Sequence, residues 1–543
     1  MNTSSPPRPF SAATRRENVA RLSTPFDLLV IGGGITGAAV ARDAAMRGFR
    51  TALIEKDDLG SGTSSRSTRL VHGGFRYLEY GEFKLVFDAC TERRFLRRSA
   101  PRLVRPLPFL YPVYRGQKPA PWKLRAGMVM YDALSLFRNV QRHRWMSAQE
   151  ARRREPLVAS RGLVSAARYY DAQVDDARLT MLTAKAAHAH GAVVVNHARV
   201  AGLLRAGGRV TGAQVIDLIG GQEVEVQAHV VLNATGIWTD QVRGMDGQAD
   251  PIIRPTKGIH LVIPRDRLHS QHAVIFSVPR DGRHIFLVPW GAFTFIGTTD
   301  TDYDGDRDHP AADLDGVEYL LEAVQLTFPG ARIGHDDVVS TWAGLRPLVS
   351  AAGSPSALSR QHVILESPSG LITVTGGKLT IERLMGEQAT DLVDKRLAES
   401  FGVHARYPCR TKGPLEPAQL GHRPVDDGPS SHLADTYGDD ATWVQAYVEE
   451  NPGLGERIVP ELPYLKAQVL YSVQHEMAIT LCDLLIRRTH VIYEMADGGL
   501  AQARGAADLM APRLGWDEAE IDRQVAAYAD QVALTQAWRD GRT

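Results

Sequence analysis

Three glycines and one carboxylate near the N-terminus have the spacing of a dinucleotide-binding site. Gly32, Gly34 and Gly37 follow the apolar run Phe26–Ile31, and Glu55 ends a second apolar run. At this spacing the first glycine makes a tight turn, the second lets the backbone approach a pyrophosphate, and the third lets the next helix pack closely on the strand. The helix N-terminus then faces the phosphates, and a carboxylate about 20 residues on accepts a hydrogen bond from a ribose hydroxyl. The sequence therefore predicts a bound dinucleotide, NAD or FAD, with Glu55 at its ribose.

The elements that must position these residues begin as a Rossmann-like βαβ unit, which other segments then interrupt. Residues 228–236 are apolar on both faces, as in a buried parallel strand, and we expect them to rejoin the dinucleotide sheet. Between residues 258 and 297, short apolar runs separated by Pro, Gly and Asp predict an antiparallel sheet that covers a ligand. From residue 441 on, the apolar period is helical. The predicted fold class is α/β: a Rossmann-like (βαβ) domain interleaved with an antiparallel-sheet, substrate-covering domain, plus a C-terminal all-α domain.

Domain boundaries follow from these patterns and from a Pro-, Gly- and Asp-rich stretch before residue 441. We expect a disordered tail at 1–24, a dinucleotide-binding domain at 25–405, a linker at 406–440 and a helical domain at 441–543. The covering domain is expected as an insertion in the second of these, mainly at residues 85–190 and 250–350.

Composition narrows the functional class. The 543 residues are 44% hydrophobic and 23% charged, and 63 basic against 62 acidic side chains leave a formal charge of +1, so we expect no nucleic-acid partner. Cys90, Cys409 and Cys482 lie far apart, which favours a reducing, cytoplasmic compartment and no structural metal site. An apparent HExxH zinc motif fails because Ile479 replaces its second histidine. No run approaches the ~20 apolar residues of a membrane-spanning helix, so any membrane contact is expected to be peripheral.

Residues 60–79, Gly-Ser-Gly-Thr-Ser-Ser-Arg-Ser-Thr-Arg-Leu-Val-His-Gly-Gly-Phe-Arg-Tyr-Leu-Glu, carry the most specific motif of the chain. This run resembles the signature of the FAD-dependent glycerol-3-phosphate dehydrogenases. The resemblance extends from about residue 26 to the C-terminus, through motifs at residues 169–173, 233–236, 297–300, 342–347, 376–380, 476–478 and 483–488. It implies FAD as the dinucleotide, oxidation of sn-glycerol 3-phosphate to dihydroxyacetone phosphate, electron transfer to a membrane quinone, and a place in glycerol and glycerophospholipid catabolism.

The resemblance also implies which residues hold the cofactor. The Ser/Thr-rich loop supplies hydroxyl and amide groups to the pyrophosphate and the flavin edge, and the Gly-Gly-Lys turn before the last helix of the domain stabilises negative charge on the reduced ring. The expected cofactor contacts are Gly32, Gly34, Ile35, Thr36, Gly37, Glu55, Thr63, Ser64, Ser65, Ser67, Thr68, Leu70, His72, Gly73, Gly74, Ala234, Thr235, Gly236, Gly377, Lys378, Leu379 and Thr380.

Oxidation of a phosphorylated secondary alcohol needs cations for the phosphate, a base for the hydroxyl proton, and hydrogen-bond donors near the reacting oxygen. Outside the family motifs, an arginine is more often a surface residue, and a lone histidine in a strand is more often structural than catalytic. Within the motifs, the resemblance implies His260 as base with His72 as its competitor, and the catalytic pair is expected to be His260 and Arg346. The expected substrate contacts are Arg76, Tyr77, Thr298, Thr299 and Lys378; the sequence leaves open which threonine faces the substrate.

A stretch dense in Arg and Lys, residues 93–154, is either a solvated basic face or a docking surface for anionic lipid. Apolar residues within it, namely Trp122, Leu124, Met128, Val129 and Tyr131, fit either an interfacial helix or a core. The resemblance favours peripheral association with the inner face of the cytoplasmic membrane, where quinone is the electron acceptor.

Other functions remain open at this stage. A soluble oxidase of the same family would use oxygen instead of quinone, and an amine or amino-acid oxidase of the same flavoprotein superfamily would have a carboxylate clamp instead of a phosphate pocket. A noncatalytic flavoprotein would have no need for Arg76, Arg346, Lys378 and His260 together. The sequence also leaves open whether the chain forms a homodimer.

Overall fold

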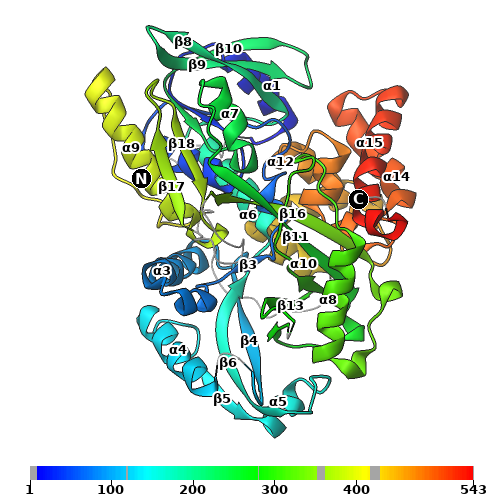
Figure 1. Ribbon diagram of the computed structural model, residues 1–543. Helices are drawn as coiled ribbons and strands as arrows, with labels where there is room; N and C mark the ends of the chain where they lie inside the picture. The colour runs from blue at the N-terminus through cyan, green and yellow to red at the C-terminus, as the bar shows by residue number, and fades with distance from the viewer. Residues whose placement is uncertain (1–8, 118–119, 279, 351–360, 416–428, 542–543) are drawn as a thin grey trace, which may run out of the picture.

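The computed structural model describes residues 9–117, 120–278, 280–350, 361–415 and 429–541. Two sheets and a C-terminal group of helices make up the molecule, and both sheets combine strands from distant parts of the chain (Figure 1).

The dinucleotide sheet is built around β1 (Phe26–Ile31), whose six residues are all buried. It pairs in parallel with β2 and β10, in the order β17-β18-β10-β1-β2-β7, while β8 and β9 extend one end of β10 as antiparallel strands. Burial on both faces explains why these parallel strands are nearly continuous apolar runs. The other strands are β2 (Thr51–Ile54), β7 (Val193–Val195), β8 (Ala198–Ala206), β9 (Arg209–Asp217), β10 (Glu223–Asn233), β17 (His362–Glu366) and β18 (Ile372–Gly376).

Helix α2 (Ile35–Arg47) starts directly after the glycine turn. A Cβ at Gly37 would lie 1.8 Å from the carbonyl oxygen of Gly32, so only glycine lets the helix pack this close to the turn. Helices α6 (Asp176–Ala189) and α9 (Glu382–Phe401) pack against α2. The first part of the covering insertion was expected at residues 85–190. It ends before α6, because α6 packs against α2 of the dinucleotide-binding domain.

The covering sheet is antiparallel except where β4 pairs with β12, and its path runs β15-β11-β14-β13-β12-β4-β6-β3. β16 pairs with β11 along ten residues, which aligns His260 with Trp342 and Thr256 with Arg346. Its strands are β3 (Leu70–Val71), β4 (Arg105–Tyr114), β5 (Arg144–Ser147), β6 (Leu163–Gln173), β11 (Ile253–Pro264), β12 (Ala273–Ser277), β13 (His284–Trp290), β14 (Phe293–Gly297), β15 (Thr301–Asp302) and β16 (Ser340–Val349). Helices around it are α3 (Phe83–Ser99), α4 (Pro121–Leu134), α5 (Ala148–Arg154) and α8 (Leu314–Thr327). Helix α7 (Thr239–Met245) instead packs on β10 and β18 of the dinucleotide sheet.

The C-terminal helices lie on one side of the two sheets (Figure 1). They are α10 (Pro429–Tyr437), α11 (Ala441–Glu450), α12 (Lys466–His475), α13 (Val491–Glu494), α14 (Leu500–Leu514) and α15 (Glu518–Gln536), with a π-helical turn η11 (Asp483–Arg488) between α12 and α13. Helix α10 lies within the stretch expected to be a linker, so the helical domain begins before residue 441. Residues 416–428 of that expected linker lie outside the described residues.

The expected disordered tail is wrong for residues 9–24. Helix α1 (Ala12–Arg21) begins at an N-cap serine, Ser11, and the preceding Phe10 is 1% exposed in the core. Arg15 is also buried, because it pairs with Asp217 at 2.5 Å and donates to the carbonyl oxygen of Asn196. The polar composition of α1 gives no sign that the helix is buried, because ion pairs with residues far away in the chain cannot be seen in a local sequence pattern. Residues 1–8 lie outside the described part of the chain.

Candidate active site

Two cavities meet at the boundary between the sheets. One, of about 620 Å³, runs along the glycine turn, and the other, of about 280 Å³, lies under the covering sheet. The two cavities adjoin, because six residues line both: Thr63, Ser67, Pro347, Gly377, Lys378 and Leu379.

The larger cavity has the features that a dinucleotide requires. Gly32 has φ +107°, and a Cβ there would lie 2.6 Å from the carbonyl oxygen of Ala234, so the turn needs glycine. At Gly34 the only atom that a Cβ would approach is Oγ of Ser64, at 3.2 Å, which leaves the backbone open toward the cavity. Glu55 accepts hydrogen bonds from the amides of Gly33 (2.6 Å) and Asp57 (2.9 Å), and burial raises the pKa of its carboxyl. These residues fit the pyrophosphate and ribose of a dinucleotide.

Most of the expected cofactor contacts line the two cavities. The larger one is lined by Gly32, Gly34, Ile35, Thr36, Glu55, Thr63, Ser64, Ser67, Ala234, Thr235, Gly236, Gly377, Lys378 and Leu379, and the smaller one adds Thr68, Leu70, His72, Gly74 and Thr380.

Gly37, Ser65 and Gly73 do not line either cavity, so the structure does not place them as direct contacts. Gly37 packs on Gly32, and a Cβ at Gly73 would lie 2.4 Å from Sγ of Cys90. Ser65 is buried within the loop, at 8% exposure. The small residues at these three positions allow close packing behind the cavity wall.

His260 lies on β11 at the wall of the smaller cavity and is 1% exposed. Its Nε2 lies 2.9 Å from Oγ1 of Thr68, and its ring stacks on that of Trp342. Burial lowers the pKa of the imidazole well below its usual 6.5, and the positive charges of Arg346 and Arg69 lower it further. The side chain is therefore neutral at physiological pH, as a proton acceptor must be.

Arg346 on β16 contacts the strand end that carries both predicted threonines. Its guanidinium donates to Oγ1 of Thr298 at 2.9 Å and to a carboxylate oxygen of Asp300 at 3.2 Å. Gly258 leaves room for this contact, because a Cβ there would lie 2.3 Å from Arg346 Nη2. The hydroxyl of Thr299 instead accepts from the amide of Ile259 at 3.1 Å. Thr298 is therefore the threonine whose hydroxyl joins the Arg346 cluster.

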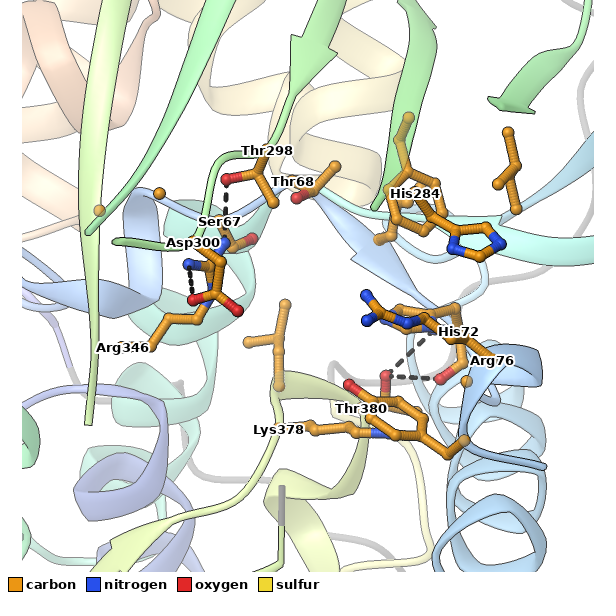
Figure 2. A pocket seen from close by; sticks show the side chains of 18 of the residues that line it. Ser67, Thr68, His72, Arg76, His284, Thr298, Asp300, Arg346, Lys378 and Thr380 are labelled. Atoms are coloured by element: carbon orange, nitrogen blue, oxygen red, sulfur yellow. Dashed lines mark hydrogen bonds and ion pairs between the residues drawn. The ribbon is translucent and has the colours of Figure 1, made fainter. Parts of the chain in front are cut away.

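The remaining cations approach from the other walls of the cavity. Figure 2 shows Arg76 and His72 across the cavity from Arg346, with Lys378 and Thr380 below them in this view. The ammonium of Lys378 lies 3.5 Å from the ring centroid of Tyr77, and Arg76 donates to the hydroxyl of Tyr80 at 3.0 Å. Burial, followed by the charge of Lys378, lowers the pKa of His72 to about 3.

The position of His72 is set by the turn that follows β18. The amide of His72 donates to Oγ1 of Thr380 at 3.1 Å, and the same hydroxyl donates to the carbonyl oxygen of His72. These two bonds join the Gly-Gly-Lys turn to the Ser/Thr-rich loop at the junction of the cavities.

Sequence reasoning missed several lining residues. Lys56 lies 3.9 Å from the ring centroid of Trp238 at the larger cavity. At the smaller cavity, His284 lies 3.1 Å from the hydroxyl of Tyr111. Trp238 stands two residues after the Asn-Ala-Thr-Gly motif and Asp300 ends the Gly-Thr-Thr-Asp motif, so both could have been included on position alone. Tyr111 and His284 carry no comparable sequence signal.

A dinucleotide cavity that adjoins a second cavity lined by His260 and by the cations Arg76, Arg346 and Lys378 fits an oxidoreductase with a dinucleotide cofactor. Comparison with protein families gives the same class: residues 27–392 match the family described as "FAD dependent oxidoreductase", and residues 383–521 match "C-terminal domain of alpha-glycerophosphate oxidase". The chain belongs to the FAD-dependent glycerol-3-phosphate dehydrogenase family, and FAD is its cofactor.

Named relatives cover nearly the whole chain. The chain is 40% identical over 532 residues to glycerol-3-phosphate dehydrogenase of Mycobacterium leprae, with 95% of this chain and 90% of the relative covered. It is 36% identical to the Synechocystis enzyme of the same name, with 94% and 97% covered.

Solved structures support the fold. The X-ray structure of glycerol-3-phosphate dehydrogenase from Bacillus halodurans, complexed with FAD, matches with a TM-score of 0.79 at 31% identity and covers 97% of this chain and 98% of that one. Glycine oxidase from Geobacillus kaustophilus is 23% identical, has a TM-score of 0.53 and covers 68% of this chain and 95% of its own, which shows a shared fold only.

Proposed function

We propose that this protein oxidises sn-glycerol 3-phosphate to dihydroxyacetone phosphate with FAD and passes the electrons to a membrane quinone. The observation that carries the proposal is the placement of Arg76, Arg346, Lys378 and His260 around one cavity that adjoins the dinucleotide cavity. The cavity volume of about 280 Å³ suits a small phosphorylated alcohol. The names of the relatives support the same substrate.

The roles of the side chains follow from their chemistry. Bound FAD supplies a hydride acceptor. His260, neutral before substrate binds, accepts the proton of the secondary hydroxyl through an imidazole nitrogen. Arg346 and Arg76 offer planar pairs of N–H donors, which suit the oxygens of a phosphate. Lys378, at the junction of the two cavities, stabilises negative charge next to the flavin.

The substrate is tested without oxygen. The purified flavoprotein is mixed with glycerol 3-phosphate, glycerol or an amino acid, and the yellow flavin absorbance is followed. We expect rapid bleaching by glycerol 3-phosphate alone. Bleaching by an amino acid and not by glycerol 3-phosphate would identify an amino-acid oxidase and reject the proposal.

The proposed quinone acceptor is supported by an exposed apolar surface on the covering domain. No helix among the described residues is long and apolar enough to cross a bilayer. Trp122, Val129 and Met130 nevertheless stand 67%, 55% and 40% exposed on α4, and Leu136 and Phe137 just after the helix are 51% and 57% exposed. We call these five residues the α4 patch. Exposed Lys123, Arg125, Arg138 and Arg142 surround it, as expected for a surface that docks on anionic lipid.

Some residues of the stretch 93–154 do not belong to this exposed surface. Leu124, Met128 and Tyr131 are core residues on the opposite side of α4, at 2%, 0% and 1% exposure. Arg93 is buried as well, in an ion pair with Asp171, so it adds no charge to the surface.

The acceptor is tested on enzyme already reduced by glycerol 3-phosphate. A short-chain quinone or air-saturated buffer is added, and the return of flavin absorbance is timed. We expect quinone to reoxidise the flavin much faster than oxygen. Faster reoxidation by oxygen, with release of hydrogen peroxide, would instead identify an oxidase.

A further inference from the structure

Residues 476–490 of the C-terminal domain, which we call the anchor segment, carry charges buried against the dinucleotide domain. Glu476 and Asp483 are fully buried, and Arg487 and Arg488 are 6% and 3% exposed. None of these four residues lines either cavity. The partners of three of them, Glu476, Arg487 and Arg488, lie in two different segments that contact the FAD site.

The first contact is with the turn that follows Glu55. Asp58 is fully buried and accepts from Arg487 Nε at 2.6 Å and from Arg488 Nη1 and Nη2 at 2.6 and 2.9 Å. The next residue, Leu59, packs on the glycine turn, since a Cβ at Gly33 would lie 2.9 Å from Leu59 Cδ2 and 2.7 Å from Glu55 Cβ. The arginines thereby fix the turn that holds the ribose carboxylate.

The second contact is with the start of α6. Glu476 accepts from Arg178 at 2.7 Å, and Nε2 of His490 lies 2.8 Å from the carboxylate of Asp175, the N-cap residue of α6. The adjacent Asp176 accepts from both the amide and the hydroxyl of Ser67, at 3.1 and 2.6 Å. Ser67 lines both cavities, so this second chain of contacts reaches the flavin-side loop.

We propose that the anchor segment positions both FAD-binding loops, so that tight FAD binding depends on the C-terminal domain. A buried charge pair holds its partners in one geometry, because neither group can exchange its partner for water without a large penalty. Coupling between two sites is reciprocal, so FAD binding must stabilise the anchor segment in return. This coupling concerns FAD binding alone and does not depend on the substrate or the electron acceptor.

Hydrogen exchange tests the reciprocal effect in the unmodified chain. Full-length protein freed of FAD is compared with the same protein after FAD is added back, and amide exchange is followed by mass spectrometry. We expect slower exchange at residues 476–490, which do not line the FAD cavity, and no change in α11 (Ala441–Glu450) of the same domain. Unchanged exchange at 476–490, or equal slowing in α11, would overturn the proposal.

A conservative substitution tests the forward effect. Arg488→Lys keeps the charge but loses the two-pronged bond to Asp58, and we expect the Kd for FAD to rise about tenfold. The control is Arg504→Lys, an exposed arginine of the same domain that pairs with Glu518 and Asp522, for which no change in Kd is expected. Arg488→Lys protein that binds FAD as tightly as wild type would also reject the inference. If that variant does not fold, the exchange experiment decides.

Discussion

The imidazole of His260 stacks on the indole of Trp342, with ring centroids 4.7 Å apart and planes 13° from parallel. The two residues face each other in the β11–β16 register. Gly297 on the other neighbouring strand leaves room for the ring, because a Cβ there would lie 2.2 Å from His260 Cδ2. With Thr68 at Nε2, these contacts allow the ring little freedom, so His260 is held in one orientation.

His260→Asn should slow flavin reduction by glycerol 3-phosphate by about 10²- to 10⁴-fold, because the proton acceptor is lost. FAD content should stay at the wild-type level, since the larger cavity does not include His260. Stopped-flow absorbance without oxygen measures the rate. The control is His284→Asn, a second histidine of the same cavity, for which a much smaller effect is expected. Equal losses in the two variants would argue against His260 as the base.

Arg346→Ala should raise the KM for glycerol 3-phosphate by about 10- to 100-fold, the usual cost of a lost charge-assisted contact to phosphate. Flavin reduction by glycerol at high concentration, which offers no phosphate to Arg346, should change far less. Steady-state kinetics with both substrates separates the two effects. Arg254→Ala is the control, because Arg254 pairs with Asp302 at the exposed end of the same sheet. Loss of flavin from Arg346→Ala would show instead that Arg346 has a structural role.

Local patterns predicted the glycine turn and Glu55, because a tight turn, a helix start and a strand end depend on residues close in sequence. The cations and His260 came from the family resemblance, and the structure brings them to one cavity. Contacts between distant residues could not be predicted. Arg178 and Glu476, which form an ion pair, are 298 positions apart. Arg93 lies in a stretch that is basic in sequence, but it is buried in an ion pair with Asp171, 78 positions away.

Trp122→Ser together with Phe137→Ser should weaken binding to anionic vesicles by more than tenfold, because each large side chain contributes about 1.5–3 kcal/mol when it leaves water. Co-sedimentation with vesicles of phosphatidylglycerol and phosphatidylcholine measures the binding, which should also weaken at high salt. Anaerobic flavin reduction should be unaffected, since neither residue lines the cavities. Trp443→Ser is the control, because Trp443 is 54% exposed on the C-terminal helix α11. Equal vesicle binding by wild type and the double variant would place the membrane contact elsewhere.

His197 gives the stability a defined pH dependence. Burial opposes its protonation, but Asp483, with Nε2 to Oδ2 at 3.0 Å, outweighs burial and raises the pKa of the imidazole above 6.5. Because the pKa of His197 is higher in the folded than in the unfolded state, its protonation stabilises the fold fully at pH values below 6.5. This stabilisation is lost as the pH rises through the pKa of the folded state. His197→Gln should therefore lower the Tm most at acidic pH, and its difference from wild type should shrink at higher pH. The control is His309→Gln, which changes an exposed histidine paired with Asp306 and should leave the Tm nearly unchanged at every pH. If the Tm difference between His197→Gln and wild type were the same at every pH, protonation of His197 would have no role in stability.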